Sequence, residues 1–234
     1  MTACQDAASC WMPIRWAARS LDTYKAVIWD WNGTLLDDVQ LCLSIANELL
    51  ADHDLPALTM ARYQEIFDFP VRLYWERAGL DLERVDFQSI SSRFCESFES
   101  RLHGASLYPG ATQVLDSARD AGIAQFLLSN TESAALGRLV AHFELAAHFD
   151  SVEGMSDTLA EGKLSGGSAL LRTHSLDPGT TLMVGDTKHD AEVARELGVD
   201  CVLVAHGHQA ASRLEGQGCV VVDSIDDLPG LLLA

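Results

Sequence analysis

Positive charge is scarce in this sequence. Its 234 residues include 16 Lys and Arg against 34 Asp and Glu, which gives a formal net charge of -18. A surface this acidic repels nucleic acids and anionic membranes, because both carry dense negative charge. Neither is therefore expected as a partner. Long apolar runs are also missing, since no segment is long and apolar enough to cross a bilayer.

Paired cysteines are missing as well. The six cysteines are scattered without a C-x-x-C pair, which is typical neither of a disulfide framework nor of a zinc site. We interpret them as reduced thiols of a cytoplasmic protein, with Cys42, Cys201 and Cys219 packed among apolar side chains. Residues 1–23 lack the apolar core of a signal peptide. This N-terminal extension is expected to be floppy, to dock on the core, or to be an artefact upstream of a start at Met12.

What is present indicates a globular protein. Hydrophobic residues make up 48% of the chain and charged residues 21%, which supplies a packed interior and argues against disorder. The length fits one large domain or a core with a small insert. We find no internal repeat and no low-complexity linker.

The stretch from Tyr24 to Leu35, YKAVIWDWNGTL, is the first that carries chemistry. An apolar run rich in β-branched and aromatic residues ends in Asp30, and a turn containing Gly33 follows. This order predicts a buried parallel strand that delivers Asp30 to the carboxyl edge of a sheet, where α/β folds bind ligands. An Asp after a strand can also serve only as a helix cap.

Three later stretches favour the chemical interpretation. They are FLLSN at 126–130, the Gly162-Lys163 pair and MVGDTKHD at 183–190. The first and third are again short apolar runs that end in polar or acidic residues. If these strands are parallel neighbours, a carboxylate, a hydroxyl, an ammonium and a second pair of carboxylates meet at one edge of the sheet. That set suits phosphoryl transfer.

The four stretches, in this order, resemble the four motifs of the haloacid dehalogenase superfamily of phosphohydrolases. Over residues 24–230 the chain is most similar to the phosphoglycolate phosphatase-like branch, whose helical cap follows the first motif. The resemblance implies an α/β fold with a Rossmann-like parallel sheet flanked by helices. It also implies a Mg²⁺-dependent cytoplasmic phosphatase, monomeric or homodimeric, that acts on a small phosphorylated metabolite.

The organisation of the chain agrees with a core and an insert. Helical periodicity predicts helices at 39–50, 59–67, 71–78 and 87–103 without an intervening strand, so we expect a helical cap over 37–104. Asp37 or Asp38 can cap the first of these helices. The core would comprise 24–36 and 105–234. There, strands are predicted at 123–128, 149–152, 181–184, 201–204 and 219–222, and helices at 111–121, 131–143, 165–174 and 191–197.

We expect Asp30 to be the nucleophile, because a carboxylate can attack phosphorus and form an aspartyl-phosphate. Gly33 would let backbone N–H groups approach the phosphoryl oxygens, and Thr34 would support that loop or contact phosphate. The resemblance assigns phosphate binding to Ser129, with Asn130 beside it. For Ser129 alone, a structural role at a strand end is the ordinary reading.

Lys163 is assigned by the resemblance to neutralise charge on Asp30 and on the transferring group. Asp186 and Asp190 offer hard oxygen ligands at a spacing suited to Mg²⁺, although Asp186 could merely cap the next helix. In the cap, Arg72 could pair with a second anionic group of the substrate, or could be an ordinary surface charge.

Asn32 departs from the family pattern. The phosphatases usually have a second Asp at this position as general acid and base, and an amide can neither give nor accept that proton. Its backbone carbonyl could still bind the metal together with Asp30. The alternative is thus a weakly active or regulatory phosphate-binding protein, or a phosphotransferase. We expect Asn32→Asp to raise turnover.

Two other classes are disfavoured. A two-component receiver also combines a phospho-accepting Asp with Ser or Thr and Lys, but it has no helical insert and carries an acidic pair near its first strand. The dehalogenase branch acts without metal, which would leave Asp186 and Asp190 without a purpose. The pair His206 and His208 is a weak indication of a metal.

Overall fold

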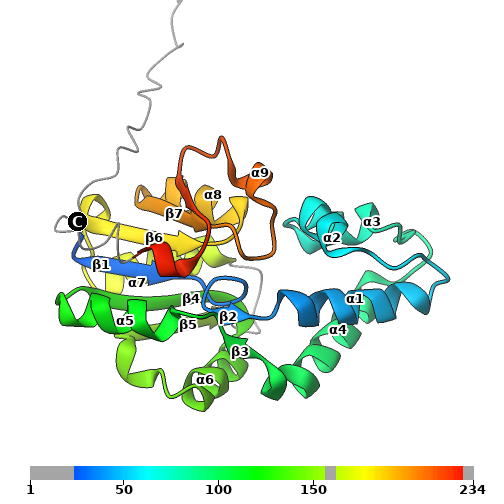
Figure 1. The fold of residues 1–234 in the computed structure, drawn as a ribbon, viewed down its shortest axis with the longest axis horizontal. Coiled ribbons are helices and arrows are strands. Elements are labelled where there is room, and N and C mark those ends of the chain that lie inside the picture. The colour runs from blue at the N-terminus through cyan, green and yellow to red at the C-terminus, as the bar shows by residue number, and fades with distance from the viewer. Residues whose placement is uncertain (1–23, 156–161, 229–234) are drawn as a thin grey trace, which may run out of the picture.

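The computed structural model describes residues 24–155 and 162–228. The expectations for residues 1–23 lie outside this part of the chain. The described residues form an α/β core with a group of helices beyond the carboxyl ends of the strands (Figure 1). No helix within the described ranges is long and apolar enough to cross a membrane.

A six-stranded parallel sheet forms the core, in the order β5-β4-β1-β6-β7-β8. A separate antiparallel pair, β2 and β3, carries the chain out of the core and back into it. The strands are β1 (Ala26–Trp29), β2 (Leu36–Asp37), β3 (Ser106–Leu107), β4 (Ala124–Glu132), β5 (Ser151–Met155), β6 (Thr181–Gly185), β7 (Asp200–Val204) and β8 (Val220–Val222).

Within residues 24–155 and 162–228, nine α-helices and four 3-10 turns complete the order of elements. The helices are α1 (Val39–Ala51), α2 (Met60–Ile66), α3 (Val71–Arg77), α4 (Phe87–Arg101), α5 (Ala111–Asp120), α6 (Ser133–His142), α7 (Lys163–Thr173), α8 (Lys188–Leu197) and α9 (Ala211–Leu214). The 3-10 turns are η2 (Leu102–Gly104), η3 (Ala146–His148), η4 (Pro178–Thr180) and η5 (Ile225–Asp227).

β1 lies at the centre of the sheet because all four of its side chains are apolar and buried. Val27 and Trp29 face the layer that contains α5 and α6, whereas Ala26 and Ile28 face α7. The chain builds β4 and β5 on one side of β1 and then β6, β7 and β8 on the other. The order therefore reverses at β1, where open α/β sheets bind their ligands.

The helices α1 to α4 share a hydrophobic cluster of their own, distinct from the clusters on the sheet. Its largest fully buried side chains include Tyr63 and Trp75. The helical region expected between the first two core strands is thus confirmed as a cap, and no described residue between α1 and α4 is in a strand. The boundaries at 37 and 104 stay a prediction, although the two crossings of the chain lie beside them in β2 and β3.

Two local expectations are wrong. The helix predicted from Thr131 begins at Ser133, because β4 continues to Glu132, whose carboxylate caps the first N–H groups of α6. Asp38 occupies the N-cap position of α1 but makes no capping hydrogen bond with its side chain. Its carboxylate is instead used in the site described below. The predicted helix end at Gly198 is confirmed, with this glycine left-handed at φ +73°.

Candidate active site

Three neighbouring strands deliver polar side chains to one edge of the sheet. Asp30 follows β1, Ser129 lies in β4 and Asp186 follows β6. The backbone N–H of Asp30 donates to the carbonyl of Val184 at 2.9 Å, which continues the pairing of β1 with β6. All three polar side chains are buried. The convergence expected from the apolar runs is therefore present in the structure.

Lys163 joins this edge from the first residue of α7. Its Nζ donates to Asp30 Oδ1 at 2.5 Å and also to Asp190 Oδ1. Burial alone would lower the pKa of this ammonium, but Asp190 and Asp30 outweigh burial and raise it. For Asp190, burial is outweighed by Lys163 and Thr187, so the pKa of that carboxyl is lowered. Lys163 is therefore a permanent positive charge between two carboxylates.

Asp30, Asp186 and Asp190 form a buried acidic cluster whose ligand oxygens lie within 4.8 Å of one another. Burial raises the pKa of Asp30 more than Lys163 lowers it. The pKa of Asp186 is raised well above its ordinary value, chiefly by burial and with further contributions from Asp30 and Asp190. Among the described residues, Lys163 pairs with Asp30 and Asp190 but not with Asp186. A divalent cation that prefers oxygen ligands fits this donor set.

Thr34 links Asp30 and Asp186, the two carboxyl groups of the cluster whose pKa is raised. Its Oγ1 lies 3.1 Å from Asp30 Oδ2 and 3.4 Å from Asp186 Oδ1. A hydroxyl has one proton, so it donates to one carboxylate at a time. In this arrangement Thr34 can orient Asp30, and its role in supporting the loop or contacting phosphate stays a prediction.

Gly33 allows the loop to pass close to Asp186. Its φ is +72°, and a Cβ at this position would overlap the carboxylate of Asp186 and the ring of His208. Its N–H donates to Leu36 O at 3.0 Å and to Asp38 Oδ1 at 2.9 Å. In this structure the backbone N–H of Gly33 is thus bonded within its own loop. The lack of a side chain lets Asp186 and His208 pack closely against this residue.

Asn32 is held by partners on both ends of its amide. Its Nδ2 donates to Asp38 Oδ2 at 2.8 Å, and its Oδ1 accepts from Thr131 Oγ1 at 2.8 Å. Ser129 Oγ lies 3.4 Å from the same oxygen and 3.1 Å from Thr131 Oγ1. The amide group is therefore matched to its surroundings, since it donates to a carboxylate and accepts from hydroxyls.

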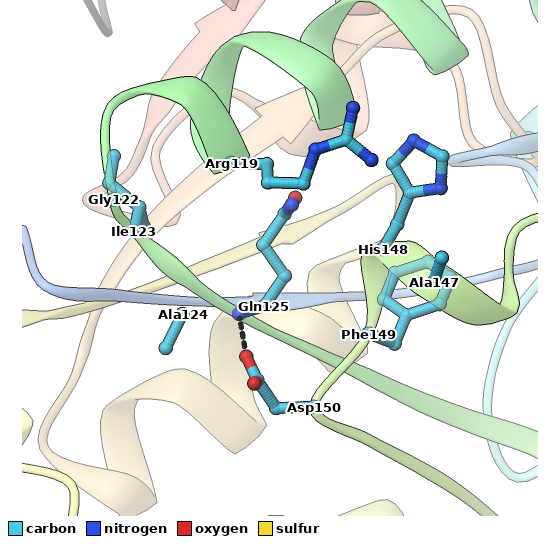
Figure 2. Close-up of a pocket in the computed structure, with 9 residues that line it drawn as sticks. All are labelled: Arg119, Gly122, Ile123, Ala124, Gln125, Ala147, His148, Phe149 and Asp150. Carbon is cyan, nitrogen blue, oxygen red and sulfur yellow. Dashed lines mark hydrogen bonds between the residues drawn. The ribbon is translucent and has the colours of Figure 1, made fainter.

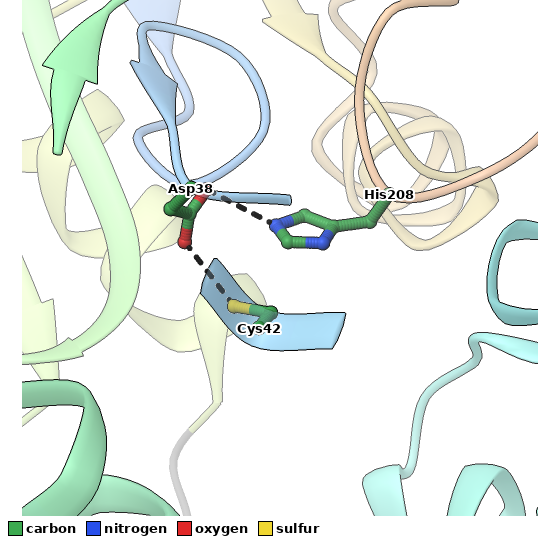
Figure 3. Close-up of side chains that lie close together, drawn as sticks. All are labelled: Asp38, Cys42 and His208. Atoms are coloured by element: carbon green, nitrogen blue, oxygen red, sulfur yellow. Dashed lines mark hydrogen bonds and ion pairs between the residues drawn. The ribbon is translucent and has the colours of Figure 1, made fainter. Parts of the chain in front are cut away.

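Asp38 connects this loop to His208 and to the cap (Figure 3). Its Oδ1 lies 3.3 Å from His208 Nε2, and its Oδ2 accepts from Cys42 Sγ at 3.6 Å. His208 Nδ1 lies 2.8 Å from the hydroxyl of Tyr63 in α2. Burial lowers the pKa of His208, but Asp38 and Asp186 raise it to about 9. His208 is accordingly a cation at neutral pH.

The cap is tied to the core through the segment between α2 and α3. The buried carboxylate of Asp68 accepts from Arg77 at 2.6 Å within the cap, and it pairs with Lys188 at 2.9 Å and Arg213 at 3.1 Å in the core. The carbonyl of Phe67 also accepts from Arg213. The structure thus has the cap closed onto the core.

Comparison with known proteins places these observations in a family. The profile of the haloacid dehalogenase-like hydrolases matches residues 27–204. The chain belongs to this family. A phosphoglycolate phosphatase of Rhodospirillum rubrum is 31% identical over 195 residues, which cover 79% of this chain and 80% of that protein. The chain is thus a haloacid dehalogenase-like hydrolase related to phosphoglycolate phosphatases.

Solved structures share the fold of this hydrolase at lower identity. A haloacid dehalogenase-like hydrolase from Streptococcus pneumoniae superposes with a TM-score of 0.73 at 18% identity, covering 89% of this chain and 99% of that one. Protein Tyrosine Kinase A of Mycobacterium tuberculosis gives a TM-score of 0.75 at 22% identity, covering 90% and 99%. At these identities the likeness shows the fold alone.

Among the residues predicted for the site, the hydrolase structure gathers Asp30, Ser129, Lys163, Asp186 and Asp190 at one edge of the sheet. Asn32, Gly33 and Thr34 lie in the loop that follows Asp30, and Asn130 lies beside Ser129 in β4.

Arg72 is different from the other predicted site residues. It pairs with Glu76 at 3.1 Å, its guanidinium lies 5.8 Å from the ring centroid of Phe87, and it donates to Leu82 O. These partners all belong to the cap. A role in substrate binding would therefore require Arg72 to exchange its partners.

Sequence reasoning missed four residues of the site: Asp38, Thr131, Tyr63 and Asp68. Asp38 was expected only as a candidate helix cap. Cys42 packs among apolar side chains as predicted, and its thiol also contacts the Asp38 carboxylate. The signal that could have revealed Asp38 is the second acid of the Asp37-Asp38 pair directly after the first motif.

A cavity of about 320 Å³ lies away from this site, at the start of β4 (Figure 2). Arg119, Gln125 and Asp150 are among its lining residues, and Gln125 N donates to Asp150 Oδ2 at 2.9 Å. Since the strands are parallel, the start of β4 is at the opposite edge of the sheet from Asp30. The cavity therefore has no part in the chemistry of the acidic cluster.

Proposed function

We propose that this hydrolase is a Mg²⁺-dependent phosphatase of a small phosphorylated metabolite, with Asp30 as its nucleophile. The observation that carries the proposal is the buried carboxylate of Asp30, held by Lys163 on one oxygen and by Thr34 on the other, next to Asp186. Two fixed hydrogen bonds orient a nucleophile and reduce the entropy lost on reaching the reactive geometry.

In the proposed reaction, an oxygen of Asp30 attacks phosphorus and the bond from phosphorus to the substrate oxygen breaks. The electron pair of that bond leaves on the substrate oxygen. Water then attacks the phosphorus of the aspartyl-phosphate and the bond from phosphorus to the Asp30 oxygen breaks. This step restores the carboxylate and releases inorganic phosphate together with a proton that passes to solvent. Lys163 remains protonated throughout, so it can stabilise the negative charge that spreads over the phosphoryl oxygens. Ser129 and Asn130 would donate to these oxygens.

The metal would be held by Asp30, Asp186, Asp190 and the backbone carbonyl of Asn32. Mg²⁺ bound there supplies the positive charge that three buried carboxylates lack and that an anionic substrate needs on a chain of net charge -18. Asp190 already accepts from Lys163 and Thr187, so it also serves to position Lys163.

Asn32 sets the proposed substrate preference. An ester with a poor leaving group needs a proton on the departing oxygen, and the amide of Asn32 cannot supply it. An acyl phosphate releases a carboxylate that needs no proton. We therefore expect faster turnover of acyl phosphates than of alkyl phosphates. Phosphoglycolate remains a candidate through the related phosphatases, and Arg72 would meet its carboxylate after leaving the exposed pair with Glu76.

A second candidate function is phosphoryl transfer to an acceptor other than water, or phosphate binding with little turnover. The environment of Asn32 favours this second function. Its amide is held between Asp38 and Thr131, so the loop position where a phosphatase would have a general base carries a fixed amide. Such a protein would form the aspartyl-phosphate and lose it slowly to water.

The test is release of inorganic phosphate from a panel of acyl, aryl and alkyl phosphates, with and without Mg²⁺, using Asp30→Asn as the blank. Metal-dependent release that disappears in Asp30→Asn supports the phosphatase. Acid-quench labelling separates the second candidate, which would give a stable phosphoenzyme without release. If neither release nor labelling is found with a folded, Mg²⁺-bound chain, both proposals fail.

The four described cysteines are free thiols, which supports the proposed cytoplasmic location.

A further inference from the structure

Asp38, Cys42 and His208 form a buried cluster beside the acidic site (Figure 3). The sequence pair His206 and His208 is divided between two environments. The ring of His206 stacks on Tyr108 with centroids 3.7 Å apart, whereas His208 turns inward to Asp38. The cluster therefore combines a carboxylate, a thiol and an imidazole, none of which acts in the proposed phosphatase reaction.

We propose that Asp38, Cys42 and His208 bind a transition-metal ion of the zinc class, at a site separate from the Mg²⁺ site. Their ligand atoms all lie within 4.8 Å of one another, and all three side chains are buried. Asp38 and Cys42 are four residues apart at the start of α1, which places them on the same side of the helix. His208 faces them from the loop after β7.

The observed spacings are close to the edges of a tetrahedral zinc centre, with His208 and Cys42 facing different oxygens of the Asp38 carboxylate. With metal distances of about 2.0 Å to nitrogen and oxygen and about 2.3 Å to sulfur, the edges of the tetrahedron are about 3.3 Å from nitrogen to oxygen and about 3.5 Å from sulfur to oxygen. His208 Nε2 lies 3.3 Å from Asp38 Oδ1, and Cys42 Sγ lies 3.6 Å from Asp38 Oδ2. Small side-chain rotations would bring all three ligands around one ion.

The surroundings orient these ligands in the way that metal sites require. His208 Nδ1 is engaged by the hydroxyl of Tyr63 at 2.8 Å, which leaves Nε2 toward the cluster. The N–H of Gly33 and the amide of Asn32 donate to the carboxylate of Asp38. Binding of the ion would displace the Nε2 proton of His208 and the thiol proton of Cys42, which pass to solvent, and the fourth position would be taken by water.

The ligand atoms of the two sites favour different metals. Sulfur and imidazole favour Zn²⁺ and its neighbours, whereas the oxygen-only set of Asp30, Asp186 and Asp190 favours Mg²⁺. Cys42 belongs to the first cap helix and His208 to a core loop. A bound ion would consequently join cap and core in the closed arrangement, and would act as a regulator of cap opening rather than as part of the chemistry.

The experiment titrates Co²⁺ into the full chain in the presence of excess Mg²⁺, which occupies the oxygen site. We expect about one equivalent of Co²⁺ to produce thiolate-to-cobalt charge-transfer absorption, which Zn²⁺ then abolishes by displacement. In Cys42→Ser this band should fall at least tenfold. The matched control is Cys219→Ser, which alters a half-buried thiol outside the cluster and should keep the band.

Absence of the band in the native chain would overturn the proposal, and so would a band that persists in Cys42→Ser or is lost in Cys219→Ser. Should Cys42→Ser fail to fold, X-ray absorption of the native chain loaded with Zn²⁺ decides instead. One sulfur and one imidazole in the coordination shell support the site, and a shell of oxygen and nitrogen without sulfur contradicts it. These readouts do not depend on phosphatase activity.

Discussion

The side-chain amide of Asn32 donates to the carboxylate of Asp38 at 2.8 Å. The residue that stands where a phosphatase of this family would have its general acid is thus paired with an acid six positions later. Replacing Asn32 by Asp alone would set a half-buried carboxylate against the buried carboxylate of Asp38, and the two would tend to share a proton. The pairing changes how the missing acid must be restored.

We expect Asn32→Asp combined with Asp38→Asn to raise turnover of an aryl phosphate by at least about tenfold, since general acid and base catalysis typically contributes about 10²- to 10⁴-fold. The double variant restores a carboxylate at position 32, and the pair formed by positions 32 and 38 still consists of one carboxylate and one amide. Steady-state phosphate release measures the effect. Asn32→Asp alone should gain less, and Asp38→Asn alone should gain nothing. A double variant no faster than the native chain would show that this amide does not limit hydrolysis.

Lys163→Met should lower phosphate release by about 10²- to 10³-fold, because it removes the charge that we propose stabilises the transferring group. It also leaves Asp30 and Asp190 without their shared partner, so stability should fall by about 3 to 5 kcal/mol. Urea unfolding and phosphate release on the same preparation measure both effects. Lys25→Met is the control, since Lys25 is exposed, and should change neither quantity. An active Lys163→Met variant would remove this lysine from the proposed chemistry.

Much of the fold follows from local pattern. The buried runs that end at Asp30, Ser129 and Asp186 are short and apolar, which indicates neighbouring parallel strands and brings these residues together. The helical cap follows from periodicity in the same way. Where a side chain overrides the pattern, the prediction fails: Thr131 was expected in a helix but lies in the irregular end of β4, where its hydroxyl reaches Asn32.

The remaining part of the site depends on contacts between distant segments. His208 reaches Asp38 across 170 positions of the chain, and Asp68 reaches Lys188 across 120. No spacing in the sequence indicates that the loop after β7 folds back over Gly33. For this reason the sequence indicates only a weak H-G-H signal at His208 and a helix cap at Asp38, and it does not reveal the contact between them.

Gly33→Ala should abolish metal-dependent phosphate release and destabilise the chain. The new Cβ would overlap Asp186 and His208, and the left-handed φ of +72° adds about 1 to 2 kcal/mol of strain. Gly122→Ala is a matched control, because Gly122 has φ +73° and no atom within 4 Å of a Cβ. Strain alone should lower the stability of Gly122→Ala by that amount while phosphate release is retained. Equal effects of the two substitutions would mean that packing against Asp186 is unimportant.

Asp68→Asn should weaken the attachment of the cap to the core. Burial alone would raise the pKa of Asp68, but Arg77 and Lys188 outweigh it and hold the pKa below its ordinary value of 3.8. The folded state therefore binds a proton at Asp68 less readily than the unfolded state. By linkage, this carboxylate contributes stability that is fully present above about pH 5 and is lost as the pH falls below about 4.

Urea unfolding of the native chain and of Asp68→Asn at pH 7 and at pH 3 measures this contribution. We expect the variant to be about 1 to 3 kcal/mol less stable at pH 7 and the difference to shrink at pH 3, where the native carboxylate is approaching protonation. Asp52→Asn is the control, because Asp52 pairs with Arg93 on the exposed surface of the cap. Such a pair contributes about 1 kcal/mol or less. A difference for Asp68→Asn that stays constant with pH would show that shape, and not charge, joins the cap to Lys188 and Arg213.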